Sequence, residues 1–391
     1  MTSELILIRF GELSTKKKNK INFINQLVNN LKTKLLPYKD SYEITKEYDR
    51  LFLKINDLKF EKQIIEIIKN TFGIFSFSYV FKINHSIDDL NKICTEITKD
   101  SKAKTFKLEC RRNFKSFHLN STEIKQTVAP FILNNVNIKV DVINPELTIF
   151  IEVRQNYIYI FKDKILTSAG LPSGSSGRGL VMLSGGIDSP VASYQMMKRG
   201  MSLDYVHFAT PPHTNDKVIE KIKNLVSSLN RFSDKKKQKL YIVNFTFLQN
   251  EIMHIKNSDY RIIIMRRMFY RIAQILAKEN NLSALITGEA LGQVASQTIE
   301  ALSVVDKLTD MPTFRPLIAM DKLEIINLAK KIKTYDISIE PFEDCCSLFV
   351  PEKPVTKPKL FKVEENEKSI ELWEQILKQI IEKHVTVLEV E

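Results

Sequence analysis

The spacing of hydrophobic residues predicts strands and helices that alternate along the first half of the chain. Short apolar runs typical of strands occupy residues 5–10, 42–47, 50–55, 75–83, 105–110, 147–153 and 157–161. Apolar positions three and four residues apart predict helices over residues 18–36, 58–69, 86–97 and 120–134. The first elements follow the order β-α-β-β, which is typical of a small ferredoxin-like unit.

The second half of the chain shows the pattern of a doubly wound α/β domain with a parallel sheet. Strands are expected at 180–183, 203–208, 240–245 and 284–287, with helices between them. A helix over 258–280 is expected to turn one apolar side inward, with Ile262, Met265, Met268, Phe269, Ile272 and Leu276. Residues 368–383 are expected to form one further helix. Ligands of such sheets bind beyond the carboxyl ends of the strands.

Residues 168–179 separate the two halves. They contain four of the eleven glycines of the chain, along with several serines and a proline, which is the composition of a linker. We therefore expect a ferredoxin-like domain over 1–58, an α/β domain over 59–167, the linker itself, and the parallel-sheet domain over 180–391. The fold class predicted for the whole chain is α/β.

The positive charge of the chain is uneven. The formal net charge is +12, and residues 1–170 carry 28 Lys and Arg against 19 Asp and Glu. A basic surface favours a polyanionic partner, so we expect the N-terminal half to bind nucleic acid. The alternative is a lysine-rich composition spread over a solvated surface.

The cysteines and the apolar stretches indicate a cytoplasmic protein with no membrane segment. Four cysteines in 391 residues are too few for a disulfide framework, and none has the CxxC spacing of a metal site. No apolar stretch is long enough to span a bilayer, and the N-terminus lacks the pattern of a secretory signal.

The sequence Ser-Gly-Gly-Ile-Asp-Ser at 184–189 is the strongest candidate for chemistry. It follows the predicted strand at 180–183 and precedes a predicted helix, with Ser189 suited to the N-cap and Pro190 to the first turn. A glycine loop at a helix N-terminus binds phosphate through its backbone N–H groups. The Walker A ending is absent. Asp188 is placed to help hold Mg²⁺ beside a bound triphosphate. The alternative is a simple Gly-Gly turn at a helix start.

Residues 102–118 interleave cations with aromatic rings. Cations neutralise phosphates, while rings provide stacking surfaces for unpaired bases. The alternative for the rings is packing in a core. The cations are Lys102, Lys104, Lys107, Arg111, Arg112 and Lys115, and the rings are Phe106, Phe114 and Phe117.

Further candidates lie near the ends of the other predicted strands. His207 and Phe208 end one strand, and the polar, glycine-containing segment 287–298 follows another. Arg266 lies in the helix over 258–280, where the alternative is a solvated face. Residues 321–324 have the pattern of a capping box that opens a helix, so Lys322 is either a bystander of the cap or a catalytic helper.

Together these motifs resemble those of a known family. The loop at 184–189 is similar to the PP-loop of ATP pyrophosphatases, and residues 59–166 resemble the RNA-binding THUMP domain. With segment 287–298 and the Glu-Asp-Cys-Cys sequence at 343–346, the chain resembles the tRNA 4-thiouridine synthetases, or tRNA sulfurtransferases. The resemblance implies that ATP adenylylates the uridine at position 8 of tRNA and that sulfur then replaces its C4 oxygen.

The resemblance also implies roles for particular residues. Mg²⁺ would accompany ATP without a protein cage, with Asp188 as the protein group that could touch it. The implied catalytic residues are Asp188, Lys322, Cys345 and Cys346. The implied ATP-binding residues are Met182, Leu183, Ser184, Gly185, Gly186, Asp188, Ser189, His207, Phe208, Arg266, Gly288 and Gln297. The implied tRNA-binding residues are Lys104, Lys107, Arg111, Arg112 and Lys115.

The resemblance does not decide which cysteine carries the sulfur or which protein donates it. Cys346 best matches the cysteine of the second step, and Cys345 is its close rival. We expect a form of the family without a C-terminal rhodanese domain, supplied with persulfide by a separate cysteine desulfurase. The family also suggests a homodimer. A role in thiamine thiazole synthesis stays open.

Two other functions compete with this reading. The first is a PP-loop ligase or amidotransferase that adenylylates a small molecule. The second is an RNA-binding protein without activity. The basic N-terminal half argues against the first, and the intact loop at 184–189 argues against the second.

Overall fold

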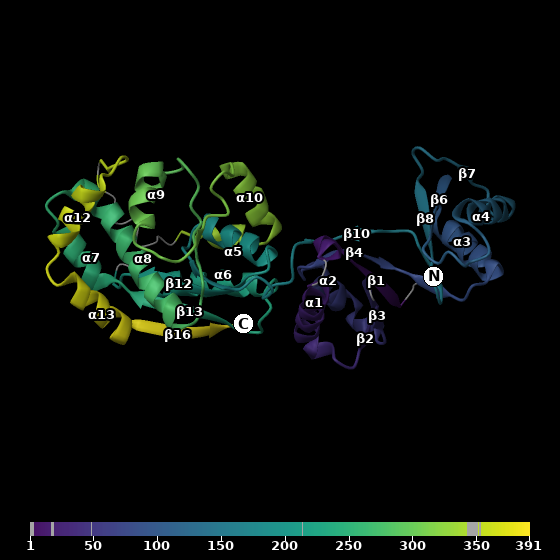
Figure 1. Ribbon diagram of the computed structural model, residues 1–391, viewed down its shortest axis with the longest axis horizontal. Helices are drawn as coiled ribbons and strands as arrows, with labels where there is room; N and C mark the ends of the chain where they lie inside the picture. The colour runs from purple at the N-terminus through teal and green to yellow at the C-terminus, as the bar shows by residue number, and fades with distance from the viewer. Residues whose placement is uncertain (1–3, 17–18, 48, 213, 342–350, 352) are drawn as a thin grey trace. The chain divides into compact units, whose positions relative to one another are not determined.

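The computed structural model is a mixed α/β protein, as expected (Figure 1). It describes residues 1–391 except 1–3, 17–18, 48, 213, 342–350 and 352. Contacts divide the chain into two compact units, residues 1–20 with 34–170 and residues 21–33 with 171–391. Within the described residues, no helix combines the length and the apolar character needed to cross a membrane.

The first sheet of the N-terminal unit is antiparallel, in the order β10-β4-β1-β3-β2. Because β4 pairs with β1, this sheet extends past residue 58, where we expected the ferredoxin-like domain to end. Its strands are β1 (Leu5–Phe10), β2 (Tyr42–Lys46), β3 (Arg50–Ile55), β4 (Ile74–Tyr79) and β10 (Ile165–Leu166). Helices α1 (Lys20–Lys34) and α2 (Glu61–Lys69) lie between the strands in sequence.

The second sheet of this unit has the order β5-β9-β8-β6-β7. Helix α3 (Ile87–Ser101) begins after the N-cap Ser86, and α4 (Ser121–Asn135) begins at a capping box of Asn120 and Glu123, in agreement with the helices predicted over 86–97 and 120–134. The strands are β5 (Phe81–Ile83), β6 (Thr105–Arg112), β7 (Lys139–Val140), β8 (Leu147–Val153) and β9 (Ile158–Phe161). Strands β8 and β9, which match the runs predicted at 147–153 and 157–161, pair antiparallel.

The single strand predicted over 75–83 is wrong, because this run forms β4 and β5 in two different sheets. Strand β4 pairs with β1, whereas β5 pairs with β9. Val80, between them, is fully buried in a cluster with Leu7 and Phe161. The residue at the junction must be apolar because it is buried, so the apolar run continues from β4 to β5 although the two strands pair with different neighbours.

Buried charges connect the two sheets of the N-terminal unit. Arg50 of β3 donates to Glu152 of β8 at 2.5 Å, and both side chains are almost inaccessible to solvent. Arg154 makes two hydrogen bonds to Asp49, at 2.8 and 3.0 Å. Partial burial raises the pKa of Asp49, but the hydrogen bond from Arg154 and the nearby arginine charges outweigh it and lower that pKa to about 2. The Asp49 carboxylate is thus held ionised beside Arg154.

The C-terminal unit contains the predicted parallel sheet, in the order β15-β14-β11-β12-β13-β16. The strands are β11 (Arg178–Met182), β12 (Ser202–Ala209), β13 (Gln238–Asn244), β14 (Leu285–Ile286), β15 (Thr313–Phe314) and β16 (Val385–Val390). The helices are α5 (Asp188–Lys198), α6 (Asp216–Asn230), α7 (Thr246–Met253), α8 (Arg261–Glu279), α9 (Ile299–Asp306), α10 (Lys322–Lys331), α11 (Tyr335–Ser338), α12 (Leu360–Lys368) and α13 (Trp373–Lys383). The four strands predicted from the sequence are β11 to β14.

The C-terminal residues differ from the single helix predicted over 368–383. Helix α12 ends at Lys368, and α13 begins only after Leu372, whose φ of 58° is left-handed and breaks the helix. Strand β16, which we did not predict, pairs antiparallel with β13 at the edge of the sheet. The short run Val-Thr-Val-Leu-Glu-Val at 385–390, rich in β-branched residues, was the available signal.

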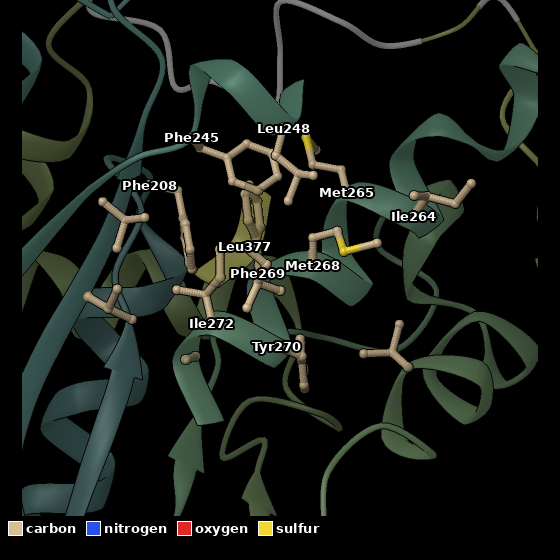
Figure 2. Close-up of a cluster of buried hydrophobic side chains, with 14 of the residues drawn as sticks. Phe208, Phe245, Leu248, Ile264, Met265, Met268, Phe269, Tyr270, Ile272 and Leu377 are labelled. Atoms are coloured by element: carbon tan, nitrogen blue, oxygen red, sulfur yellow. The ribbon is translucent and has the colours of Figure 1, made fainter. Parts of the chain in front are cut away.

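Helix α8 forms the centre of the core of this unit (Figure 2). Of the residues predicted to face inward, Met265, Met268, Phe269, Ile272 and Leu276 are buried and Ile262 is partly buried. The Phe269 ring stacks on Phe208 of β12 with a centroid distance of 4.0 Å and contacts Phe245 edge-on at 4.7 Å. The core therefore fixes α8 against the end of β12.

We expect Glu152→Ala to destabilise the N-terminal unit by about 3 kcal/mol, because it leaves Arg50 buried without its partner. Hydrogen exchange of β3 and β8 amides in the full chain measures this change. The matched control is Glu109→Ala in the same sheet, because Glu109 pairs with Lys107 at the half-exposed surface, where we expect a change below about 1 kcal/mol. Equal effects of the two substitutions would contradict the prediction.

Candidate active site

The loop between β11 and α5 is closed by two serines. The Ser184 N–H donates to Ser189 Oγ at 3.0 Å, and the Ser189 hydroxyl donates to the Ser184 carbonyl at 3.2 Å. Helix α5 begins at Asp188, and its N-cap, Ile187, supplies no side-chain hydrogen bond. The prediction that Ser189 is the N-cap is therefore wrong, because its hydroxyl ties the loop together. The N-terminal end of α5, where backbone N–H groups favour an anion, faces this loop.

A cavity of about 340 Å³ opens beside the loop, at the carboxyl ends of the parallel strands β11, β12 and β14. It brings together most of the residues predicted to bind ATP, namely Met182, Leu183, Ser184, Asp188, Ser189, His207, Phe208, Arg266, Gly288 and Gln297. Gly185 and Gly186 lie in the loop between Ser184 and Asp188. Its wall also includes Phe269, Tyr270, Thr287, Glu289, Val294 and Ser296.

The end of β12 provides an imidazole and a ring at the cavity. The Nδ1 atom of buried His207 lies 2.9 Å from the carbonyl oxygen of Leu183, so Nδ1 carries the proton in this contact. Phe208 is supported from behind by Phe269. These contacts fix both side chains before any ligand binds.

Asp188 is held by two side chains from distant parts of the chain. Lys322 Nζ lies 2.6 Å from Oδ1 of Asp188, and Gln293 Nε2 donates to Oδ2 at 2.9 Å. Lys322 is the first residue of α10, which begins at the predicted capping box of Asp321 and Glu324. The box therefore sets the position of the lysine beside the catalytic candidate.

A single carboxylate in the wall of the cavity, beside the loop, fits the way proteins bind Mg²⁺, with one or two carboxylates and the remaining positions filled by phosphate and water. Asp188 is the residue of this site that fits such a role. Among the residues that the structure describes, no three His, Cys, Asp or Glu side chains gather as a metal cage.

Gly288 allows the end of β14 to approach the start of α5. A Cβ atom at this position would lie 2.6 Å from the backbone nitrogen of Ser189 and 2.8 Å from the carbonyl carbon of Asp188. Farther along the same segment, the Gln297 side chain accepts a hydrogen bond from the Ala290 N–H at 3.3 Å. The glycine therefore lets two main-chain segments form one wall of the cavity.

Tyr270 and Glu289 line the cavity although the sequence predicted no role for them, and Arg315, which also had no predicted role, contacts both. Glu289 is buried and forms ion pairs with Arg266 and, at 2.6 Å, with Arg315 Nε. The Tyr270 hydroxyl donates to Glu289 at 3.2 Å. Glu289 lies in the segment 287–298 and Arg315 in an Arg-Pro-Leu sequence, but nothing in the sequence pairs them.

The cations of 102–118 lie just before β6, within it and in the loop that follows it. Lys104, Arg111 and Lys115 are exposed, whereas Lys107 and Arg112 are half-buried. Lys107 pairs with Glu109 at 3.4 Å, and Arg112 donates to the Phe117 carbonyl at 3.2 Å. The rings of this stretch belong to the core, with Phe106 and Phe117 buried and Phe114 packed against them, so the alternative of core packing is the correct one.

The cysteines divide into two groups. Cys345 and Cys346 lie outside the described residues. Cys94 is fully buried, and burial raises the pKa of its thiol. Burial also raises the pKa of Cys110 to about 11. Both thiols of the N-terminal unit are therefore protonated near neutral pH and serve packing.

Family sequence models match three successive parts of the chain. The model described as "Thiamine biosynthesis protein (ThiI)" matches residues 174–372. The "ThiI ferredoxin-like domain" matches residues 5–78, and the THUMP domain matches residues 84–163. The matched ranges follow the sheets, since the ferredoxin-like match ends within β4 and the THUMP match begins after β5.

Relatives and solved structures agree with this assignment. The chain is 43% identical over 370 residues to a probable tRNA sulfurtransferase of Thermoanaerobacter sp. (strain X514), covering 94% of this chain and 96% of the relative. It is 45% identical over 390 residues to a protein of the same name from Mycoplasmopsis agalactiae, covering 98% and 99%. A crystal structure of a 4-thiouridine synthetase–RNA complex with bound ATP matches with a TM-score of 0.89 and 32% identity over the whole of both chains. PH1313 from Pyrococcus horikoshii Ot3 matches with a TM-score of 0.67 and 26% identity, covering 85% of this chain and 100% of its own. The chain belongs to the ThiI family of tRNA sulfurtransferases.

Proposed function

We propose that this protein is an ATP-dependent tRNA sulfurtransferase that converts a uridine of tRNA, the one at position 8, into 4-thiouridine. The observation that carries the proposal is the cavity at the carboxyl ends of β11, β12 and β14, where the loop at 184–189, Arg266 and the Asp188–Lys322 pair converge. Family membership favours this function over a PP-loop ligase or amidotransferase acting on a small molecule. The chain also carries a THUMP domain, and a ligase or amidotransferase that acts on a small molecule has no need of an RNA-binding domain.

The first half-reaction forms an adenylate. The uracil O4 attacks the α-phosphate of ATP, the bond to the β-phosphate breaks, and pyrophosphate leaves. The N-terminus of α5 and the loop N–H groups stabilise the negative charge that develops on the phosphates. We propose that His207 and Phe208, which line the cavity, contact the base, and that Arg266, in the same wall, contacts the anionic part of the nucleotide.

Mg²⁺ would neutralise charge on the departing pyrophosphate, as it does in other phosphate-transferring sites. Asp188 would hold it through Oδ1 or Oδ2. Lys322 lies against Oδ1 and would then be free to turn to a phosphate oxygen. In this proposal Asp188 binds the metal ion and Lys322 binds a phosphate oxygen, so both side chains have a function at the triphosphate site.

We propose that RNA binds the exposed cations of the THUMP domain. Arg111, Lys104 and Lys115 are available at the surface, and Lys107 and Arg112 extend the same stretch of chain. Since the rings between them are used by the core, these residues would contribute through phosphate contacts and counterion release rather than by stacking.

The second half-reaction delivers sulfur. The terminal sulfur of a cysteine persulfide attacks C4 of the adenylated uridine, the C4–O bond breaks and AMP leaves. A thiol then attacks the remaining S–S bond, which leaves the terminal sulfur on C4 as thiouridine and forms a disulfide that an external thiol, such as free cysteine, reduces. We assign the acceptor role to Cys346, with Cys345 as the alternative, and propose a separate cysteine desulfurase as the source of the persulfide. A cytoplasmic homodimer completes the proposal.

The proposal as a whole is tested by incubating the protein with ATP, Mg²⁺, cysteine, a cysteine desulfurase and unmodified tRNA. We expect pyrophosphate release that depends on tRNA, and the near-ultraviolet absorbance of thiouridine in the product. Absence of both signals would contradict the function. Pyrophosphate release with a small molecule in place of tRNA would favour the ligase alternative.

Asp188→Asn is expected to lower tRNA-dependent pyrophosphate release by at least about 100-fold, because it removes the charge that holds the metal and Lys322. The matched control is Asp216→Asn, since Asp216 is the first residue of α6 as Asp188 is of α5, but is exposed and lies outside the cavity wall. The control should keep the wild-type rate. A wild-type rate in Asp188→Asn would overturn its catalytic assignment.

Gly288→Ala is expected to weaken ATP binding and to destabilise the C-terminal unit by about 1–3 kcal/mol, because the added methyl group collides with the backbone of α5. Isothermal titration with ATP and thermal unfolding measure the two effects. Gly292→Asn is the control in the same segment. No atom lies within 4 Å of a Cβ at Gly292, and Asn tolerates its φ of 73°. Normal ATP binding by Gly288→Ala would contradict the close approach.

Cys346→Ala is expected to keep tRNA-dependent pyrophosphate release but to abolish thiouridine formation, because only the second half-reaction needs the thiol. Cys110→Ala serves as the control, since that thiol is protonated and packed in the THUMP core. If Cys345→Ala alone stops sulfur transfer, the assignment between the two adjacent cysteines is wrong.

A further inference from the structure

Glu289 lines the ATP cavity, yet protein donors occupy both of its carboxylate oxygens. Arg266 forms an ion pair with Oε1, and Arg315 Nε lies 2.6 Å from Oε2. The hydroxyls of Thr287 and Tyr270 also donate to Oε2, at 2.9 and 3.2 Å. The residue is only 8% exposed. A carboxylate satisfied in this way acts on the ligand through its partners rather than by direct contact.

The partners of Glu289 are themselves held in place. Arg315 is fixed on its far side by Asp306, at 2.5 and 3.1 Å, and it donates to the Tyr270 hydroxyl oxygen at 3.2 Å. Burial raises the pKa of the Tyr270 phenol, so its proton stays in place to be donated to Glu289. Two arginines and two carboxylates balance one another, which allows this network to remain largely buried.

Of the two arginines of the network, Arg266 is the one that lines the nucleotide site. Besides its ion pair with Glu289, it donates to the carbonyl oxygen of Ser296 in the wall of the cavity. An arginine side chain has many rotamers, and fixing it before the ligand arrives removes that ordering cost from binding. The carboxylate and the carbonyl therefore set the guanidinium in one orientation.

We propose that Glu289 is a positioning residue of the nucleotide site, which holds Arg266 in the orientation that binds the anionic part of ATP. The inference rests on the proposed function, because it takes Arg266 as a ligand of ATP. In this proposal Glu289 affects ATP binding only through Arg266. Arg315 and Asp306 in turn hold the Glu289 carboxylate in place.

The test compares Glu289→Gln with Glu367→Gln in the full chain. Glu367 is also a buried carboxylate bound to arginines of α8, Arg267 and Arg271, but it lies outside the cavity wall. For Glu289→Gln we expect the Kd for ATP to rise about 10- to 100-fold, the range for one lost hydrogen bond to a charged group. The rate of pyrophosphate release at saturating ATP should change much less. Glu367→Gln should lower the melting temperature while its Kd for ATP stays within about twofold of wild type.

A double variant separates positioning from general destabilisation. If Glu289 acts through Arg266, then Arg266→Gln/Glu289→Gln binds ATP no more weakly than Arg266→Gln alone. Additive losses in the double variant, or wild-type affinity in Glu289→Gln, would overturn the inference. Asp306→Asn tests the same contacts from the exposed side of Arg315 and can be measured even if Glu289→Gln folds poorly. We expect its Kd for ATP to rise about two- to fivefold. An unchanged Kd would overturn the role of Arg315 and Asp306 in holding Glu289. Failure of the wild-type protein to bind ATP would instead refute the proposed function along with it.

Discussion

The proposed adenylylation site depends on one close approach between two main-chain segments. The end of β14 passes so near the first turn of α5 that only a glycine, Gly288, fits between them. This approach joins the phosphate-binding loop to the segment 287–298, which supplies Gln293 to Asp188 and Ser296 to Arg266. Without it, the loop would be a helix start with no opposite wall. Most of the other contacts at the cavity become possible once these two segments meet.

The elements that the sequence predicted well are those specified within a few residues. The capping box at Asp321 was recognisable because both partners lie within four positions. The run over 75–83 shows the limit of such reasoning, since its pattern is that of a strand throughout while its hydrogen-bonding partners change at Val80. Which sheet a strand joins is decided by distant residues. Strand β16 was missed for a similar reason, because its place depends on the edge left open by β13.

The candidate site likewise combines features that nearby residues specify with features that depend on distant residues. The convergence of the loop, His207 and Gly288 could be predicted, because parallel neighbouring strands end at the same edge of a sheet. The network around Glu289 could not be predicted, since its members are separated by up to 49 positions, from Arg266 to Arg315, and nothing in the sequence pairs them. Ser189 shows a finer limit, because a serine at a helix start has two possible uses, and only the folded loop decides between capping and closure.

Helix α8 shows how one element serves both folding and chemistry. Successive side chains on a helix point about 100° apart, so the adjacent residues Arg266 and Arg267 face different surroundings. Arg266 faces the cavity and Glu289, whereas Arg267 faces the C-terminal helix α12 and its buried Glu367. Each of the two arginines forms an ion pair with a different carboxylate. The apolar residues of α8 fill the core. Because the helix is clamped on the α12 side by contacts that do not reach the ligand, the cavity side can present a fixed guanidinium. The C-terminal helices therefore contribute to the nucleotide site although none of their described side chains lines it.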